Sequence, residues 1–489
     1  MIRRIVVLAS GLLFMSSLAA AQSRCDEVLH HLAGRLADAV CVESPDLTTA
    51  NPATTPANDS LPGLPPFAFT PQTDRNVIAP SPAKRPPITK VVPGLQIQAR
   101  FADDPTGQGR FLLRLPHDWN GNLVVAGAAG TRSEFNGDFA WSDFVLQKGY
   151  AYASQNKGML NLRFSTAADP LACRLNPASP LYVHFYDNDP GLSFTRWREF
   201  MVSAAEVARQ GVKARYGHRP RFTYAVGTSN GGYQVRRAIE TAPELFDGGV
   251  EWEGTFVDPR GPNLLMHLPA AILNFPDYVA SGMSATSTAA KNIRAAGYPP
   301  DLKAGAASLW NSYSTSYWEV THCQWQKRLD PGYDTYGNDG TATYNYIERL
   351  SQSDVGEQLA AFATTGRIKR PLISVAGTMD ALLPIDLHAR SYARRVDERD
   401  DDGPRRPRWP DRGAPYRLYE VQNGTHLDLL QDTFPEIELV MPHAQRAFEL
   451  LVRHVEQRTP LPPDQCVGRG GLIADAPAAA GHCPNLLAP

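Results

Sequence analysis

The sequence predicts an α/β fold, in which a mostly parallel central sheet is covered by helices on both faces. Continuous apolar runs at 123–126, 222–226 and 371–376 are typical of strands that are buried on both faces of a parallel sheet. Helical patterns alternate with such runs, as at 193–216 and 434–456. This alternation of strand and helix patterns predicts the α/β class.

Residues 1–21 have the pattern of a secretory signal peptide. Two arginines precede an apolar run, and three alanines form the small-residue cleavage site. The run is too short to span a membrane, and no later stretch is apolar over the required length. We therefore expect a secreted or periplasmic protein without a membrane partner. The net charge of −2 gives no reason to expect a nucleic-acid partner, and the oligomeric state stays open.

Six cysteines are an even number, and an oxidising compartment permits disulfides. Sequence alone cannot choose among their pairings. Proximity favours Cys25 with Cys41 and Cys466 with Cys483, which leaves Cys173 with Cys323. The cysteines do not have the spacing of a zinc site, so we expect no metal–thiolate centre.

Changes in composition and in sequence pattern divide the chain into five parts. We expect a signal peptide at 1–21, an N-terminal helical and Pro-rich extension at 22–90, a core at 91–257 and 367–458, a lid insertion at 258–366, and a C-terminal tail at 459–489. The core opens with a β-hairpin, because 95–101 and 111–115 are strand-like and flank a glycine-containing turn. Further strands are expected at 123–126, 150–154, 222–226, 248–256, 371–376 and 416–421.

The segment 227–232, Gly-Thr-Ser-Asn-Gly-Gly, is the centre of the functional prediction. It follows the strand at 222–226 and precedes a helical pattern. A strand, a G-x-S-x-G and a helix form a nucleophile elbow, in which a tight turn lifts the serine above the sheet edge. We expect Ser229 to be the nucleophile and the backbone N–H of Asn230 to face an oxyanion beside it. A structural turn is the alternative.

Small residues at 127–130 directly follow the strand at 123–126. They let backbone N–H groups approach a ligand, and an α/β-hydrolase places its second oxyanion donor there. We expect Ala128 to be this donor, with Gly127 as the second choice. An ordinary strand-to-helix turn is the alternative.

Asp380 and His426 each come just after a predicted strand, so they lie with Ser229 at the carboxyl edge of the sheet. The chain order Ser, Asp, His is that of the α/β-hydrolase fold, which is the fold that we expect. His426 would take the proton of Ser229, and Asp380 would fix the imidazole tautomer.

Other acidic residues provide alternatives for the acid. Asp258 follows the sixth strand and is the main substitute, whereas Asp386 and Asp428 are weaker ones. The structural alternatives are a helix N-cap for Asp380 and a loop position for His426.

The region 258–366 breaks the alternation and is interpreted as a lid after the sixth strand. We expect most of its aromatic residues to form the lid's own core and one or two to face the substrate; they are Trp310, Tyr313, Tyr317, Trp318, Trp325, Tyr333, Tyr336, Tyr344 and Tyr346. Four residues carry the hard oxygen ligands that suit calcium: Asp330, Asp334, Asn338 and Asp339. Their spacing is not that of an EF-hand, and we predict no metal in the catalytic site.

Short motifs along the core carry a resemblance to a known family. They are Leu115-Pro116 with Trp119-Asn120-Gly121, Lys148-Gly149-Tyr150-Ala151, Tyr216-Gly217 with Pro220, the elbow itself, and Leu245-Phe246-Asp247-Gly248. On these motifs, residues 90–456 resemble exported α/β-hydrolases of the tannase/feruloyl esterase group. The resemblance implies ester hydrolysis, a lid and no redox cofactor, and it maps the catalytic serine, acid and histidine onto Ser229, Asp380 and His426.

The chain departs from that family at two positions. The residues before the serine and the histidine are disulfide-bonded cysteines in the family, but here they are Thr228 and Thr425. The elbow is also similar to that of secreted 3-hydroxybutyrate oligomer hydrolases.

We therefore expect an exported serine esterase that acts on a small-molecule or oligomeric ester through an acyl-enzyme, without a cofactor. Aromatic esters of the feruloyl or galloyl kind come first, and 3-hydroxybutyrate or similar polyester oligomers are the alternative. A secreted binding protein on an inactive hydrolase scaffold and a peptidase are the remaining alternatives.

Overall fold

The computed structural model describes residues 24–58, 70–130, 133–159, 163–184, 194–333, 343–401, 416–477 and 481–488. The expected signal peptide lies outside the described residues, so it stays a prediction.

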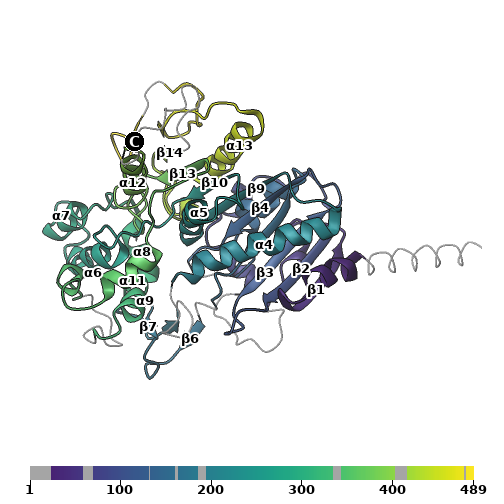
Figure 1. The fold of residues 1–489 in the computed structure, drawn as a ribbon. Helices are drawn as coiled ribbons and strands as arrows, with labels where there is room; N and C mark the ends of the chain where they lie inside the picture. The colour runs from purple at the N-terminus through teal and green to yellow at the C-terminus, as the bar shows by residue number, and fades with distance from the viewer. Residues whose placement is uncertain are drawn as a thin grey trace, which may run out of the picture.

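A ten-stranded sheet runs through the molecule in the order β1-β2-β3-β5-β4-β9-β10-β13-β14-β15 (Figure 1). Its strands are β1 (Leu36–Ser44), β2 (Gly94–Phe101), β3 (Arg110–Pro116), β4 (Asn122–Gly127), β5 (Ala151–Gln155), β9 (Phe222–Thr228), β10 (Gly248–Trp252), β13 (Leu372–Gly377), β14 (Tyr416–Val421) and β15 (Gln465–Val467). The pairs β1–β2, β2–β3 and β3–β5 are antiparallel. All neighbouring pairs in the rest of this sheet, from β5–β4 to β14–β15, are parallel. The mostly parallel sheet and the hairpin β2–β3 are as predicted.

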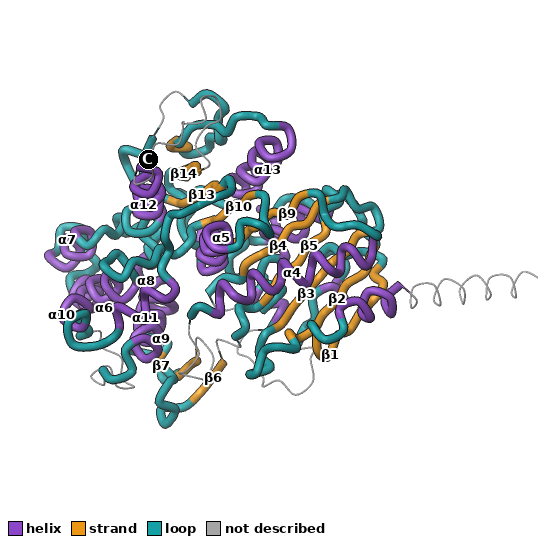
Figure 2. The backbone as a smooth tube through the Cα atoms, viewed as in Figure 1, coloured by secondary structure: helices purple, strands orange, loops and turns teal. Residues whose placement is uncertain are grey.

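Helices cover both faces of the sheet, as the strand patterns predicted (Figure 2). One face packs against α4 (Arg196–Tyr216), α5 (Asn230–Thr241), α12 (Ala389–Asp401) and the helix at 24–32, and the other against α3 (Asp143–Leu146) and α13 (Met441–Gln457). Successive residues of a strand point to opposite faces. Val125 of β4 therefore packs in the cluster with α4, and Val124 packs in the cluster with α13.

Both edges of the sheet come from segments in which we predicted no strand. β1 begins at Leu36, within the extension that we expected to be helical and Pro-rich, and β15 comes from the tail. β1 lacks an apolar run because it is an edge strand, with Val40 and Val42 about half exposed. β15 has only three residues, too few to show a pattern.

Three disulfides join the cysteines in the expected pairs: Cys25–Cys41 and Cys466–Cys483, which proximity favoured, and Cys173–Cys323, the pair that was left. The first attaches β1 to the helix before it, and the last attaches β15 to the end of the tail.

The segment between β10 and β13, which we call the lid, forms a separate group of helices beside the sheet (Figure 2), and its role as a lid stays a prediction. Its elements are α6 (Leu264–Ala280), α7 (Thr288–Ala295), β11 (Lys303–Ala304), β12 (Ala307–Ser308), α8 (Leu309–Tyr313), a π-helical turn at Ser314–Trp318, α9 (Glu319–Leu329), α10 (Tyr346–Arg349) and α11 (Val355–Phe362). Trp310, Trp318 and Trp325 are almost fully buried in its hydrophobic core, as we predicted for most of the aromatic residues.

A small three-stranded sheet lies next to the lid. It contains β6 (Arg163–Ser165), β7 (Cys173–Arg174) and β8 (Tyr182–His184), in the order β6-β8-β7. The disulfide Cys173–Cys323 joins β7 to α9.

The calcium prediction rests mainly on residues outside the described ranges. Asp334, Asn338 and Asp339 lie there. The carboxylate of Asp330 accepts two hydrogen bonds from Arg349, at 2.6 and 2.9 Å, and one from the Tyr344 hydroxyl at 2.9 Å. Calcium binding therefore stays a prediction.

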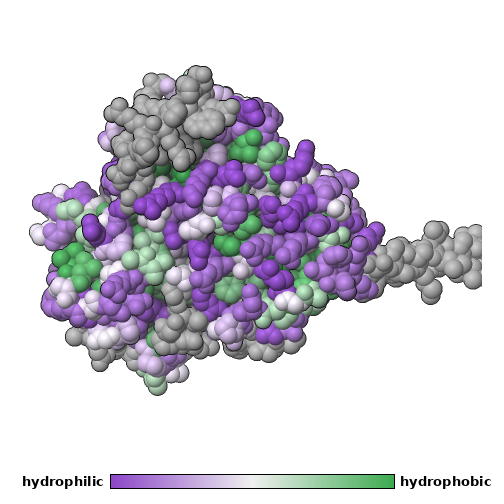
Figure 3. All heavy atoms as spheres, in the orientation of Figure 1, coloured by the Kyte–Doolittle hydropathy of each residue, from purple (hydrophilic) through white to green (hydrophobic). Residues whose placement is uncertain are grey.

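The face in Figure 3 is mostly hydrophilic, with small separate hydrophobic patches. Within the described ranges, no helix combines the length and the apolar character that crossing a membrane requires.

Candidate active site

The elbow forms between β9 and α5. Ser229 has φ +58° and ψ −120°, which is unusual for a residue other than glycine and marks a strained turn. The turn requires glycine on both sides, because a Cβ on Gly227 would lie 2.3 Å from the Gly231 carbonyl oxygen. The N–H of Ser229 donates to the carbonyl of Trp252 at 2.8 Å, which fixes the elbow to β10.

The three predicted catalytic side chains meet at the carboxyl edge of the sheet. Nε2 of His426 lies 2.9 Å from Oγ of Ser229, and Nδ1 lies 2.7 Å from Oδ2 of Asp380. Asp380 and His426 are buried, at 1% and 3% exposure. The other carboxylate oxygen of Asp380 accepts the N–H groups of Leu382 and Leu383, both at 2.7 Å. These bonds fix the carboxylate with one oxygen directed at the imidazole.

The alternative acids have other partners. Asp258 pairs with Arg395, and Asp386 pairs with Arg390 at 3.0 Å. Asp428 accepts the N–H of Val440 at 2.7 Å, at the start of α13. None of these pairings involves His426, so Asp380 is the predicted acid that the structure brings to the imidazole.

Sequence reasoning missed a second acid, Glu253. Its Oε2 lies 3.4 Å from Nδ1 of His426. The signal that could have revealed it is its position directly after β10, five residues before Asp258. Burial and the neighbouring charge of Asp380 raise the pKa of Glu253 well above its ordinary value.

The predicted oxyanion donors come from two elements, the start of α5 and the end of β4 with its following loop. Asn230 begins α5 and lines the cavity beside the serine, and Gly127 ends β4. The loop after β4 reaches this cavity through Ala129 and Gly130, one and two residues beyond Ala128. The choice of Ala128 or Gly127 as the second donor stays a prediction.

Gln234 of α5 connects the two sides of the expected oxyanion hole. Its Nε2 donates to the carbonyl of Ala128 at 2.8 Å and to Oδ1 of Asn230 at 2.9 Å. Its Oε1 accepts from Nε2 of Gln155 at 2.6 Å. Lys157, fully buried, donates through Nζ to the carbonyls of Ala129, at 2.7 Å, and Gly130. This buried network fixes the loop after β4 against the elbow helix.

A small cavity of about 60 Å³ opens at Ser229 and His426. The lid contributes Leu264, Tyr317 and Trp325 to its wall, so two of the lid's aromatic residues face it. Two further contributions were not predicted. Val77 and Ile78 of the N-terminal extension line it, and so do Leu382 and Leu383 after Asp380. The cavity is therefore mainly apolar, which suits the carbon skeleton of an ester.

Thr228 and Thr425, which directly precede the serine and the histidine, make separate contacts. The hydroxyl oxygen of Thr228 accepts from the indole N–H of Trp141 at 3.4 Å. The hydroxyl of Thr425 lies 2.8 Å from that of Tyr313 in the lid and donates to the carbonyl of Met379 at 3.2 Å. Hydrogen bonds to the lid and to the acid loop thus hold the residue before His426.

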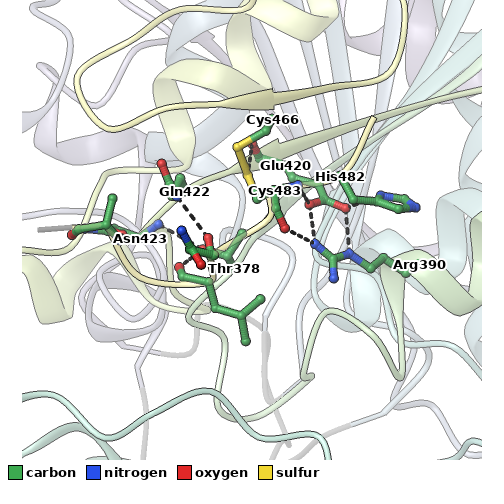
Figure 4. The surroundings of a disulfide bond; sticks show 11 residues. Thr378, Arg390, Glu420, Gln422, Asn423, Cys466, His482 and Cys483 are labelled. Carbon is green, nitrogen blue, oxygen red and sulfur yellow. Dashed lines mark hydrogen bonds and ion pairs between the residues drawn. A yellow bond between two sulfur atoms is a disulfide. The ribbon is translucent and has the colours of Figure 1, made fainter. Parts of the chain in front are cut away.

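The C-terminal tail lies against Thr378, Gln422 and Asn423, which directly follow β13 and β14 (Figure 4). Asn423 donates to the carbonyl of Ala488 at 2.8 Å and accepts its N–H at 2.7 Å. Thr378 donates to the carbonyl of Leu486, and Gln422 donates to that of Asn485 at 2.9 Å. The disulfide Cys466–Cys483 attaches this part of the tail to β15.

The family model of the 3HB-oligomer hydrolases (3HBOH) matches residues 333–488. This segment contains Asp380, His426 and the tail, but it does not contain Ser229. The tail lies outside residues 90–456, the range of the resemblance expected from the sequence. D-(-)-3-hydroxybutyrate oligomer hydrolase of Ralstonia pickettii is 34% identical over 125 residues, 24% of this chain and 16% of that protein. The enzyme of the same name from Ralstonia nicotianae is 32% identical over 137 residues, 26% and 17% of the two chains. The match thus spans about a sixth of these relatives.

Solved structures resemble this one over most of the chain. Feruloyl esterase B from Aspergillus oryzae has a TM-score of 0.51 at 12% identity, over 90% of this chain and 91% of that one. Tannin acyl hydrolase from Aspergillus niger has a TM-score of 0.43 at 12% identity, over 80% and 87%. Similarity at this level of identity concerns the fold alone. The chain has the α/β-hydrolase fold, and its last third is similar in sequence to the 3HB-oligomer hydrolases.

Proposed function

We propose that the protein is a serine hydrolase of carboxylic esters, with Ser229 as nucleophile, His426 as general base and Asp380 as the acid that orients it. One observation carries this proposal: the line of contacts from Oγ of Ser229 through the imidazole to Oδ2 of Asp380, at 2.9 and 2.7 Å. Both distances lie in the range of a nucleophile that is activated by an oriented base.

In the proposed reaction, His426 takes the hydroxyl proton of Ser229 through Nε2 while Oγ attacks the ester carbonyl. The negative oxygen that forms would be bound by the N–H of Asn230 and by an N–H of the loop after β4. When the tetrahedral intermediate collapses, His426 gives its proton to the leaving alcohol. Water then attacks the acyl-enzyme with the same base, which releases the acid and restores Ser229.

Two substrate classes are proposed. For aromatic acyl esters, the support is the pair Tyr317 and Trp325 in the cavity wall, since aromatic rings pack well against one another. For 3-hydroxybutyrate oligomers, the support is the sequence similarity over 333–488. The small, largely aliphatic cavity suits the short acyl unit of the second class.

The first experiment tests the serine. A fluorophosphonate probe should label the wild-type protein and leave Ser229→Ala unlabelled, and hydrolysis of p-nitrophenyl butyrate should be lost in the same variant. A binding protein on an inactive scaffold would not be labelled. Retained hydrolysis in a folded Ser229→Ala variant would contradict the assignment.

The second experiment distinguishes the substrates. Feruloyl, galloyl and 3-hydroxybutyrate esters are compared by kcat/KM, with casein beside them to detect a peptidase. A ratio above about tenfold between two classes corresponds to more than about 1.4 kcal/mol of differential transition-state binding and decides the class.

We also propose export to the periplasm or the medium through the signal peptide at 1–21. The three disulfides support it, since such bonds persist in oxidising compartments. Fractionation of an expressing bacterium, followed by mass determination of the N-terminus, tests both points.

A further inference from the structure

Two carboxyl groups approach the same ring nitrogen of His426. Oδ2 of Asp380 lies 2.7 Å from Nδ1, and Oε2 of Glu253 lies 3.4 Å from it. One ligand atom of each of the three residues lies within 4.8 Å of the others. The two acids follow neighbouring parallel strands, β13 and β10, so the sheet itself brings them together.

The structure gives Glu253 the character of a functional residue. Its backbone has φ +52°, a conformation that is unfavourable for a residue with a Cβ and is concentrated at functional sites. Its side chain is only 2% exposed. The donors to its carboxyl group, the N–H of Gly377 at 2.9 Å and the indole N–H of Trp252 at 3.1 Å, are both neutral. A buried carboxyl group with neutral partners is costly as a charge, so its position beside His426 needs an explanation.

We propose that Glu253 is a second acid of the site, a positioning residue that can orient His426 and stabilise its imidazolium when Asp380 does not carry the charge. The proposal rests on the esterase mechanism proposed above. It assigns no bond change to Glu253, since the proton of Ser229 moves only to Nε2 and back.

Charge and hydrogen bonding explain why Asp380, and not Glu253, is the main acid beside Nδ1 of His426. Two buried carboxyl groups at this separation disfavour each other's ionisation. Leu382 and Leu383 donate N–H groups to Asp380 and hold its carboxyl group beside Nδ1 of His426. Burial and the charge of Asp380 raise the pKa of Glu253 well above its ordinary value, which disfavours a charge on Glu253 while Asp380 is present.

Burial favours the neutral forms of two histidines and two tyrosines near the pair. Burial lowers the pKa of His267 to about 4 and that of His388 well below its ordinary value. Burial also raises the pKa values of Tyr298 and Tyr313 well above their ordinary range. Burial raises the pKa of Asp428 to about 7, and its charge adds to the rise in the pKa of Glu253. Removal of Asp380 therefore leaves Glu253 as the carboxyl group beside Nδ1.

The test is a double-mutant cycle of Asp380→Ala and Glu253→Gln, with p-nitrophenyl butyrate as the substrate. We expect Glu253→Gln to lower kcat by at most about fivefold in the wild type. In the Asp380→Ala variant, the same substitution should lower kcat by a factor at least about ten times larger, because the effects of coupled residues are not additive. We also expect kcat of Asp380→Ala to rise with pH, as Glu253 ionises. Equal effects of Glu253→Gln in both backgrounds would overturn the proposal.

Asp258→Asn is the matched control, because this acid follows the same strand but pairs with Arg395. It should change kcat by the same small factor in both backgrounds. Circular dichroism establishes folding of each variant. Should Glu253→Gln not fold, Asp380→Asn replaces it. An asparagine amide donates to Nδ1 and displaces its proton, so Asp380→Asn should be less active than Asp380→Ala while Glu253 is intact. The reverse order would contradict the proposal.

Failure of the esterase proposal would be visible separately. Wild-type protein that no fluorophosphonate labels would contradict the enzyme assignment itself. Labelled and active wild-type protein with additive variants would contradict only the role of Glu253.

Discussion

The serine side and the histidine side of the site are held in place by different parts of the chain. The serine side, meaning Ser229, Asn230 and the loop 127–130, is fixed by a buried polar network centred on Gln234. The histidine side, meaning Asp380, His426 and their loops, contacts the C-terminal tail instead. The serine side is thus built within the core, whereas the loops of the histidine side also contact residues 485–488.

This difference matches the pattern of sequence similarity. The family model of the 3HB-oligomer hydrolases covers 333–488, which is the histidine side together with the tail that supports it. The serine side lies outside that match. The tail and the two loops thus lie within one matched segment, and we expect changes on the two sides to have different effects.

The largest effect is expected where the two sides meet. His426→Ala should lower kcat by about 10⁴-fold or more, because it removes the only group that contacts both Ser229 and Asp380 in the proposed mechanism. The measurement is kcat for p-nitrophenyl butyrate, with His454→Ala on the exposed end of α13 as the control. A folded His426→Ala variant that keeps a tenth of the activity would contradict the proposed site.

The serine side is tested by Gln234→Leu. It should lower kcat by about 10- to 100-fold and leave KM nearly unchanged, since a displaced oxyanion donor acts mainly in the transition state. Gln445→Leu is the matched control, because this buried glutamine donates to the carbonyl of Ala140 on the other face of the sheet. Equal losses of kcat in the two variants would show that Gln234 has only a structural role.

The histidine side is tested by removal of its disulfide. Cys466→Ser with Cys483→Ser should lower the free energy of unfolding by about 3 kcal/mol and kcat by about threefold, because the tail is released from β15. Cys25→Ser with Cys41→Ser is the control, since it opens a loop of nearly the same length, 16 against 17 residues, at the other edge of the sheet. We expect the same loss of stability there without the loss of kcat. If both pairs change kcat equally, the tail does not support the histidine side.

The sequence allowed prediction of the residues that follow long buried strands. Ser229, Asp380 and His426 each come after such a strand, and parallel strands bring those ends to one edge. Glu253 satisfies the same rule but was overlooked in favour of Asp258, because the expected strand at 248–256 ran four residues beyond the end of β10.

Other features had no local signal. Val77 and Ile78 reach the cavity from a Pro-rich segment without periodicity. The bonds of Gln234 depend on the spacing of β4 and α5, which no sequence pattern encodes. The edge strands β1 and β15 are too exposed or too short to show an apolar run. These features come from tertiary packing, which overrides local preference.

The smallest effect on the rate is expected from Asp428, which joins the histidine loop to the start of α13. Burial raises its pKa from 3.8 to about 7. At a pH between these two values, the folded protein therefore keeps a proton on Asp428 that the unfolded chain has lost. Its contribution to stability is therefore complete below about pH 4 and is lost as the pH rises through 7. The full shift corresponds to a contribution on the order of 4 kcal/mol.

Urea unfolding at pH 5, 6, 7 and 8 measures this dependence. Asp428→Asn should remove part of the decrease in stability between pH 5 and 8 and change kcat by less than about twofold. Asp143→Asn is the matched variant, since burial raises the pKa of this acid to about 6 at the start of α3, where it binds Thr49. The pH range in which Asp143→Asn changes the free energy of unfolding should lie about one unit below that of Asp428→Asn. A wild-type stability that rises from pH 5 to 8, with an unchanged slope in Asp428→Asn, would show that the two N–H donors keep Asp428 ionised throughout.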